Sequence, residues 1–148
     1  MSEESAPPRF GLLVVTHGGL AFELVQALRR IVGEVSPVKA LSIDWEVGLS
    51  DAREVVRQAI EEVDPGGGVL ILTDMFGGTA TNVTLPFLCD GVEIVTGVNL
   101  PMMIKFANIA RSSTLREAAA LIKEQGQRAI ALAADYLDTP AGEQGSGA

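Results

Sequence analysis

Short apolar runs alternate with amphipathic segments along most of the chain. Near-continuous apolar runs at 10–16 and 69–73 predict strands that are buried on both faces, and residues 38–44 and 92–96 predict two more strands. Apolar residues at helical spacing predict helices between and after these strands. The predicted helices cover residues 20–32, 51–63, 79–88, 101–110 and 115–125.

The helix predicted over 20–32 has a clear apolar repeat and a clear end. Leu20, Leu24, Leu28 and Ile31 recur at helical spacing, and Gly33 provides a natural stop.

The stretch 128–137 is ambiguous, because its alanines favour a helix while its apolar residues alternate as in a strand. The expected division is a flexible lead over 1–8, one domain over 9–137 and a disordered tail over 138–148.

Capping patterns predict where two helices begin. Asp51 and Glu54 fit a D-x-x-E start, which is related to the capping box, and Thr114 with Glu117 fits the capping box itself. The helix that follows Thr114 is expected to end before Gly126.

Strand and helix alternate through four strands, which predicts an α/β fold. Parallel strands joined by right-handed crossovers place helices on both faces of a central sheet, so we expect a three-layer sandwich. A flavodoxin-like strand order, 2-1-3-4, makes the first and third strands neighbours. In such folds the ligand crevice lies beyond the carboxyl ends of the strands, where the strand order reverses.

Composition narrows the class of protein. The chain has 148 residues, with 11 basic and 19 acidic side chains and a net charge of −8, which argues against binding to nucleic acid or anionic membranes. The single cysteine, Cys89, excludes an internal disulfide and a cysteine metal cluster, and we expect it to be buried. Met102 and Met103 are expected core residues. The polar start and the absence of an apolar run near the roughly 20 residues of a spanning helix predict a cytoplasmic protein without membrane insertion.

His17 is the only histidine of the chain, and it follows the first predicted strand. Asp74 follows the third. Because these strands are neighbours in the predicted order, His17 and Asp74 should lie side by side in the crevice. A carboxylate that accepts a hydrogen bond from Nδ1 sets the tautomer of the imidazole and leaves the lone pair on Nε2, which then serves as a base or a nucleophile.

The surrounding residues decide between these roles. The hydroxyls of Thr16, Thr79 and Thr81 lack a nucleophile motif, and one histidine has no soft partner ligand for a metal. If the imidazole itself attacks phosphorus, backbone N–H groups must bind the phosphoryl oxygens. Gly77 and Gly78 open a predicted helix and Gly18 follows the histidine, so both loops suit an anion.

Each of these residues also has an ordinary structural explanation. A lone histidine is often structural, Asp74 suits a turn, and Asn99 with Pro101 suits a helix start. Taken together, however, three loops marked by glycine or proline follow three strands at one edge of the sheet, and this favours a functional site.

Three motifs carry a resemblance to a known family. They are THGG at 16–19, TDMFGGTATN at 73–82 and GVNLPM at 97–102. In this order they resemble the mannose-family IIA component of the bacterial sugar phosphotransferase system, over about residues 10–137. The resemblance implies an α/β sheet of four parallel strands, with one antiparallel edge strand exchanged between the subunits of a homodimer. It would make 128–137 that strand.

The same resemblance implies a chemistry without metal or cofactor. His17 would accept a phosphoryl group from the phosphocarrier HPr and pass it to a separate IIB component, or report it to a regulatory target. Asp74 would hold the ring, and Gly18, Gly78 and Thr79 would contact the phosphoryl group. The residues expected to shape the site are Thr16, Phe76, Gly77, Asn82, Asn99 and Pro101.

The motifs differ from the family pattern at three positions. Thr79 and Ala80 stand where serine and proline are common, and Phe76 stands where tryptophan often occurs. The sequence names no sugar. Two alternatives stay open: the phosphotransferase subunit of dihydroxyacetone kinase, and a non-catalytic anion-binding or signalling module. A receiver domain would use Asp74 as its phosphoacceptor, but no acidic pair follows the first strand to hold Mg²⁺.

Overall fold

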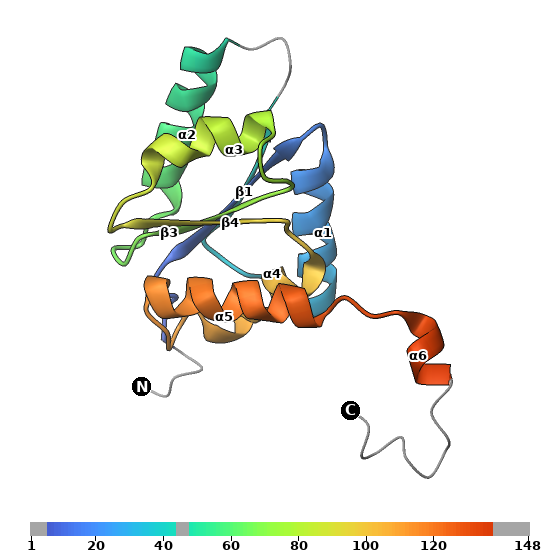
Figure 1. Cartoon of the computed structure of the whole chain (residues 1–148). Coiled ribbons are helices and arrows are strands. Elements are labelled where there is room, and N and C mark those ends of the chain that lie inside the picture. The colour runs from blue at the N-terminus through green and yellow to red at the C-terminus, as the bar shows by residue number, and fades with distance from the viewer. Residues whose placement is uncertain (1–5, 44–47, 138–148) are drawn as a thin grey trace.

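The computed structural model describes residues 6–43 and 48–137. The predicted tail and most of the predicted lead, as well as Asp44 at the end of a predicted strand, lie outside this range. The elements in chain order (Figure 1) are β1 Gly11–His17, α1 Leu20–Val32, β2 Val38–Ile43, α2 Leu49–Val63, β3 Val69–Thr73, α3 Thr79–Thr84, η2 Leu85–Phe87, β4 Val92–Thr96, α4 Leu100–Ile109, α5 Leu115–Arg128 and α6 Ala133–Leu137.

The four strands form one parallel sheet in the order β2-β1-β3-β4, which confirms the predicted order. Val14 of β1 pairs with Ala40 on one side and with Leu72 on the other, so β1 and β3 are the central strands. Both central strands are buried along almost their whole length because helices cover both faces of the sheet. Because β1 and β3 are parallel neighbours, their carboxyl ends lie side by side at the same edge of the sheet.

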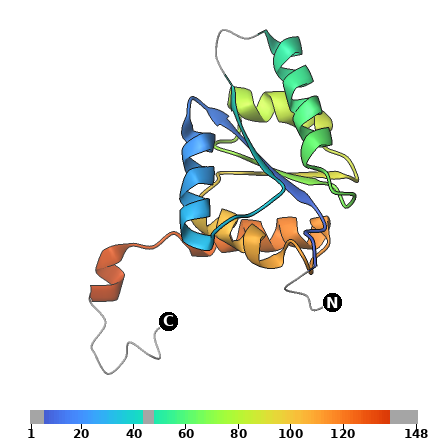
Figure 2. The same ribbon diagram turned by 180° about the vertical axis from the view of Figure 1, so that it is seen from behind.

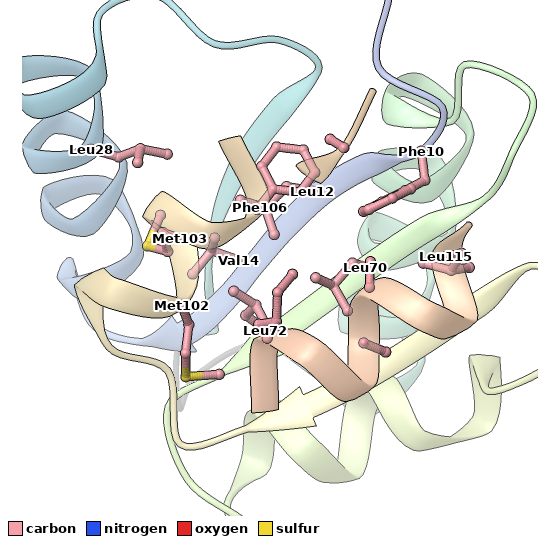
Figure 3. Close-up of a cluster of buried hydrophobic side chains, with 14 of the residues drawn as sticks. Phe10, Leu12, Val14, Leu28, Leu70, Leu72, Met102, Met103, Phe106 and Leu115 are labelled. Carbon is pink, nitrogen blue, oxygen red and sulfur yellow. The ribbon is translucent and has the colours of Figure 1, made fainter. Parts of the chain in front are cut away.

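Side-chain alternation divides the core into two layers. Leu12, Val14 and Leu72 point to the face covered by α1, α4 and α5, whereas Val15 and Ile71 point to the face covered by α2 and α3. Both views show the sheet between these two helical layers (Figure 1 and Figure 2). Figure 3 shows the layer under α1, α4 and α5. In this layer the rings of Phe10 and Phe106 pack edge to face, with 5.5 Å between their centroids.

Two helices begin earlier than the sequence predicted. α2 starts at Leu49, with Gly48 as its N-cap and Asp51 inside its first turn, so the D-x-x-E start was wrong. α4 starts at Leu100 because the side chain of Asn99 caps it by accepting a hydrogen bond from the backbone of Met102. The capping box at the start of α5 is confirmed.

α5 passes through Gly126 and ends at Arg128, so the predicted end before this glycine was wrong. The structure supplies the reason: a Cβ atom at Gly126 would lie 2.6 Å from Sδ of Met102. Glycine is there because α4 and α5 approach closely, and it does not end the helix.

The predicted edge strand at 128–137 is also wrong. α5 includes Arg128, and Ala133–Leu137 forms the short helix α6, which lies apart from the sheet in both views (Figure 1 and Figure 2). Ile130 and Leu132 are 80% and 67% exposed, so this segment has no buried contacts that would hold it extended. Without a paired strand, the helix propensity of its alanines prevails.

Burial differs from the sequence expectation at two places, α1 and Cys89. The buried face of α1 is formed by Ala21, Val25 and Leu28, whereas Leu20 and Ile31 are largely exposed. Cys89, expected to be buried, is exposed. Met102 and Met103 lie in the core as expected.

Candidate functional site

His17 and Asp74 meet at the carboxyl edge of the sheet, as the strand order predicted. His17 is the last residue of β1, and Asp74 directly follows β3. Nδ1 of the imidazole lies 2.8 Å from Oδ2 of Asp74, and the backbone N–H of His17 donates to the same oxygen at 2.9 Å. The two side chains are only 21% and 14% exposed, so water competes little for this pair.

The carboxylate of Asp74 is held on both oxygens. Oδ1 accepts a hydrogen bond from the backbone of Met75 at 3.0 Å, while Oδ2 faces His17. Burial raises the pKa of Asp74, but the hydrogen bonds from the backbone and the ring of His17 outweigh it, so the net pKa is lowered. Asp74 is therefore an acceptor, and its partner Nδ1 carries the ring proton.

This lowered pKa predicts a pH-dependent contribution to stability. A carboxyl group whose pKa is lower in the folded state stabilises the protein above its ordinary pKa of 3.8, and that contribution is lost as the pH falls through the lowered value. We expect the wild-type advantage in free energy of unfolding over Asp74→Asn to shrink as the pH falls below the ordinary pKa of 3.8 and through the lowered pKa. Urea unfolding at several pH values measures it.

The matched control for this series is Asp90→Asn, which removes the same charge at an exposed position. Its free energy of unfolding should follow that of the wild type across the acid range. Parallel pH curves for the wild type and Asp74→Asn would show that the His17–Asp74 pair does not contribute in this way.

Gly78 lies against the other edge of the imidazole. A Cβ atom built on Gly78 would be 2.8 Å from Cε1 and 3.4 Å from Nε2 of His17. Its φ of −84° and ψ of 176° are open to any residue, so close packing against the ring is the reason for glycine here. Gly77 differs, because its φ of +84° favours glycine for the turn itself.

The turn after His17 is held by two hydroxyl groups. Ser42 Oγ donates to the carbonyl of Gly18 at 2.5 Å, and the backbone of Ala21 donates to Oγ1 of Thr16 at 2.7 Å. The side chain of Thr16 is fully buried, so it supports the start of α1 and does not face the crevice. The predicted site residue Thr16 thus supports the site indirectly, through the contact of its side chain with the start of α1.

The next predicted residues lie in the loop after β3 and in α3. Thr79 is the first residue of α3 and is half-buried, whereas Phe76 is 73% exposed. Asn82 is exposed, and its backbone donates to the carbonyl of Gly78. Phe76 also lines a cavity of about 510 Å³ that runs beside β4, with Leu85 among its other walls.

The third loop is tied to the fold through Asn99. Its Oδ1 accepts from the backbone of Met102 at 3.1 Å, and its Nδ2 donates to the carbonyl of Gly126 at 3.2 Å. Pro101 lies in the first turn of α4. These contacts join the loop to α4 and α5.

Two residues that support the site, Ser42 and Thr81, were not identified in that role from the sequence. Ser42 was not singled out, although a serine paired with Thr16 near the carboxyl end of β2 was a usable signal. Thr81 was considered only as a nucleophile, yet its hydroxyl donates to the carbonyl of Met75 at 2.5 Å. No local pattern identifies that partner.

Across residues 6–43 and 48–137, no helix is long and apolar enough to cross a membrane. In the same part of the chain, no group of three or more histidine, cysteine, aspartate or glutamate side chains is placed to hold a metal ion.

The fold and the site together define a class: a parallel α/β domain that holds a histidine with a carboxylate where the strand order reverses. The sequence profile described as "PTS system fructose IIA component" (EIIA-man) matches residues 11–123. The chain therefore belongs to the EIIA-man family, the IIA components of the sugar phosphotransferase system.

Individual relatives agree with this assignment. The chain is 23% identical over 129 residues to the fructose-specific EIIA component of Bacillus subtilis, covering 86% of this chain and 88% of that protein. It is 26% identical over 123 residues to the mannose-specific EIIAB component of Escherichia coli, covering 80% of this chain but only 38% of that longer protein. The PTS IIA protein associated with the fucose utilization operon of Streptococcus pneumoniae superposes with a TM-score of 0.79 at 26% identity, covering 90% of this chain and 99% of that structure.

Proposed function

We propose that the protein is a phosphohistidine carrier. His17 accepts a phosphoryl group from phospho-HPr on Nε2 and passes it to a separate IIB protein or uses it for regulation. The observation that carries this proposal is the 2.8 Å contact between Nδ1 of His17 and Asp74 at the carboxyl edge of the sheet. Membership of the EIIA-man family supports it.

The proposed step moves one phosphoryl group between two nitrogen atoms. The lone pair on Nε2 of His17 attacks phosphorus, the new N–P bond forms, and the N–P bond of the donor breaks with its electrons returning to the donor nitrogen. The imidazole becomes cationic as this happens, so its hydrogen bond to the ionised Asp74 strengthens. The donor is already a phosphoramidate, so positioning supplies most of the catalysis and the step uses no metal or cofactor.

The loops around the ring have proposed roles in the same step. Gly18, Gly78 and Thr79 contact the phosphoryl oxygens, which bring roughly two negative charges to this edge of the sheet. The packing of Gly78 along the Cε1–Nε2 edge supports this role. The residues proposed to shape the site around them are Thr16, Phe76, Gly77, Asn82, Asn99 and Pro101.

The test is phosphate transfer from labelled phosphoenolpyruvate through enzyme I and HPr. Acid-labile, base-stable label on the protein, located at His17 by peptide mapping, supports the carrier. Label from acetyl phosphate that requires Mg²⁺ and maps to Asp74 supports a receiver-type module instead. If label on His17 then passes to a dihydroxyacetone kinase subunit and to no IIB protein, the alternative kinase role is supported.

Replacement of Asp74 by asparagine should slow this transfer. Asparagine keeps a similar shape but removes the charge that stabilises the cationic ring. A hydrogen bond to a charged group contributes about 1.5–3 kcal/mol, so we expect the rate to fall by about tenfold to about a hundredfold. Rapid-quench measurement of transfer from phospho-HPr checks this. Asp90→Asn serves again as the charge control, and an unchanged rate in Asp74→Asn would show that ring and carboxylate are not coupled in the reaction.

We also propose that the protein is a homodimer. The 510 Å³ cavity lies beside β4, and its walls combine apolar side chains with the charged side chains of Glu93, Arg116 and Lys123. Beyond α5, Leu132 and Leu137 are 67% and 84% exposed, and burying them against another chain would be favourable. A second copy that covers these surfaces would remove both from water. Light scattering should give twice the chain mass, and Leu132→Asp with Leu137→Asp should lower it to that of one chain.

A further inference from the structure

Three buried threonines lie beneath the loop that carries Asp74. Thr73, Thr81 and Thr84 are all 0% exposed. A buried hydroxyl group destabilises the fold unless it forms hydrogen bonds, so the partners of each one are informative. Thr84 follows the common helical solution, since its hydroxyl donates to the carbonyls of Ala80 and Thr81 within its own helical segment.

Thr81 differs because its hydroxyl bonds outside α3. Its Oγ1 donates to the carbonyl of Met75 at 2.5 Å and lies 3.2 Å from Oγ1 of Thr73. A hydroxyl group has one proton, and the Met75 carbonyl can only accept. The proton of Thr81 therefore points to Met75, and the hydroxyl of Thr73 donates to Thr81. The result is a directed chain from the end of β3, through α3, to the Asp74 loop.

This chain ends one residue from the carboxylate that holds the imidazole. The N–H of Met75 donates to Oδ1 of Asp74 at 3.0 Å, while the carbonyl of Met75 accepts from Thr81. Met75 is thus fixed at both of its backbone polar groups. Because Oδ1 is held in this way, Oδ2 of Asp74 is directed toward Nδ1 of His17.

We propose that Thr81 is a positioning residue for the His17–Asp74 pair. It holds the carbonyl of Met75, which sets the orientation of the Asp74 carboxylate and so the tautomer of His17. Its effect on phosphoryl transfer rests on the function proposed above, but its effect on the tautomer does not. Thr81 acts through Met75, whose carbonyl accepts its hydroxyl proton.

The substitution that isolates this role is Thr81→Val. Valine has nearly the same shape but leaves the Met75 carbonyl without its hydroxyl donor and Thr73 without its acceptor. We expect the Asp74 loop to shift by a fraction of an ångström and the rate of phosphoryl transfer to fall by about tenfold, less than the roughly hundredfold loss that accompanies a displacement of about 1 Å. Thr81→Ser keeps the hydroxyl and should restore most of the rate.

The decisive readout is the tautomer of His17 in the unphosphorylated protein. His17 is the only histidine, so the ¹⁵N resonances of the imidazole need no assignment by mutation. At alkaline pH the wild type should show mainly the Nδ1–H tautomer, because Asp74 accepts that proton. In Thr81→Val the population of this tautomer should fall, and in Thr81→Ser it should return. Thr84→Val is the matched control, since it removes an equally buried hydroxyl that bonds only within its own helical segment.

The outcomes separate this proposal from the function it builds on. A wild-type tautomer population in folded Thr81→Val, or an equal shift in Thr84→Val, overturns the positioning role. No label on the wild type from phospho-HPr overturns the proposed carrier, while the tautomer measurement still decides the role of Thr81. If Thr81→Val does not fold, Thr81→Ala removes the same hydroxyl with less steric conflict at the Met75 carbonyl, and the same readout applies.

Discussion

A protein in which alanine replaces His17 should accept no phosphate from phospho-HPr above background, yet fold like the wild type. His17 is the only imidazole in the chain, so no second histidine can take over as nucleophile. The side chain lies at the edge of the sheet and is 21% exposed, so its removal leaves both core layers intact. Labelling measures the loss of transfer, and circular dichroism during heating measures the fold.

The two measurements must be read together. Label retained on His17→Ala at another residue would contradict the carrier proposal directly. Loss of label accompanied by loss of the folded signal would show only that the variant is unfolded. In that case His17→Gln, which keeps a polar side chain near Asp74, should fold and still take no label.

Alanine at Gly78 should have the next largest effect, although it adds only one methyl group. The new Cβ would lie 2.8 Å from Cε1 of His17 and 3.1 Å from Cγ of Met75, so the imidazole must move. A displacement of about 1 Å at a reacting group reduces the rate by about a hundredfold, and we expect a loss of that size in transfer from phospho-HPr. Rapid-quench kinetics measures the rate, and urea unfolding should show a much smaller effect on stability.

Gly19→Ala is the matched control for this substitution. Gly19 lies in the other glycine-containing loop, has a φ of −84°, and has no atom within 4 Å of an added Cβ. Its transfer rate should stay within about twofold of the wild type, because exposed substitutions without special contacts change energies by only about 0.5 kcal/mol. Equal losses in both variants would show that loop flexibility matters, and not packing of Gly78 against the ring.

Much of the candidate site could be predicted because it depends on strand order. His17 and Asp74 are 57 residues apart, but His17 ends β1 and Asp74 directly follows β3. These two strands are neighbours in the order that strand–helix alternation favours. The hydrogen bond between them followed from that placement. The resemblance to the EIIA family pointed to the same pair, and the family itself is now confirmed by the profile match.

The supporting contacts could not be predicted in the same way. Ser42 bonds to Gly18 and Thr81 bonds to Met75, and both bonds depend on where two backbones pass each other. A hydroxyl group in the sequence has several possible partners within reach, and only the packed structure selects one. The role of Gly78 has the same origin, since its backbone angles are ordinary and only the neighbouring ring excludes a side chain.

The sequence by itself determined the parallel α/β architecture, the order of the strands, the α5 capping box and the meeting of His17 with Asp74. Those features arise from local periodicity and from rules of chain connection, which act on every chain of this pattern. Only the tertiary structure decided which face of α1 is buried, why α5 continues through Gly126, and that residues 133–137 form a helix. These outcomes depend on contacts between segments far apart in the chain, whose energies exceed the local propensity of one residue, or on the absence of a strand to pair with.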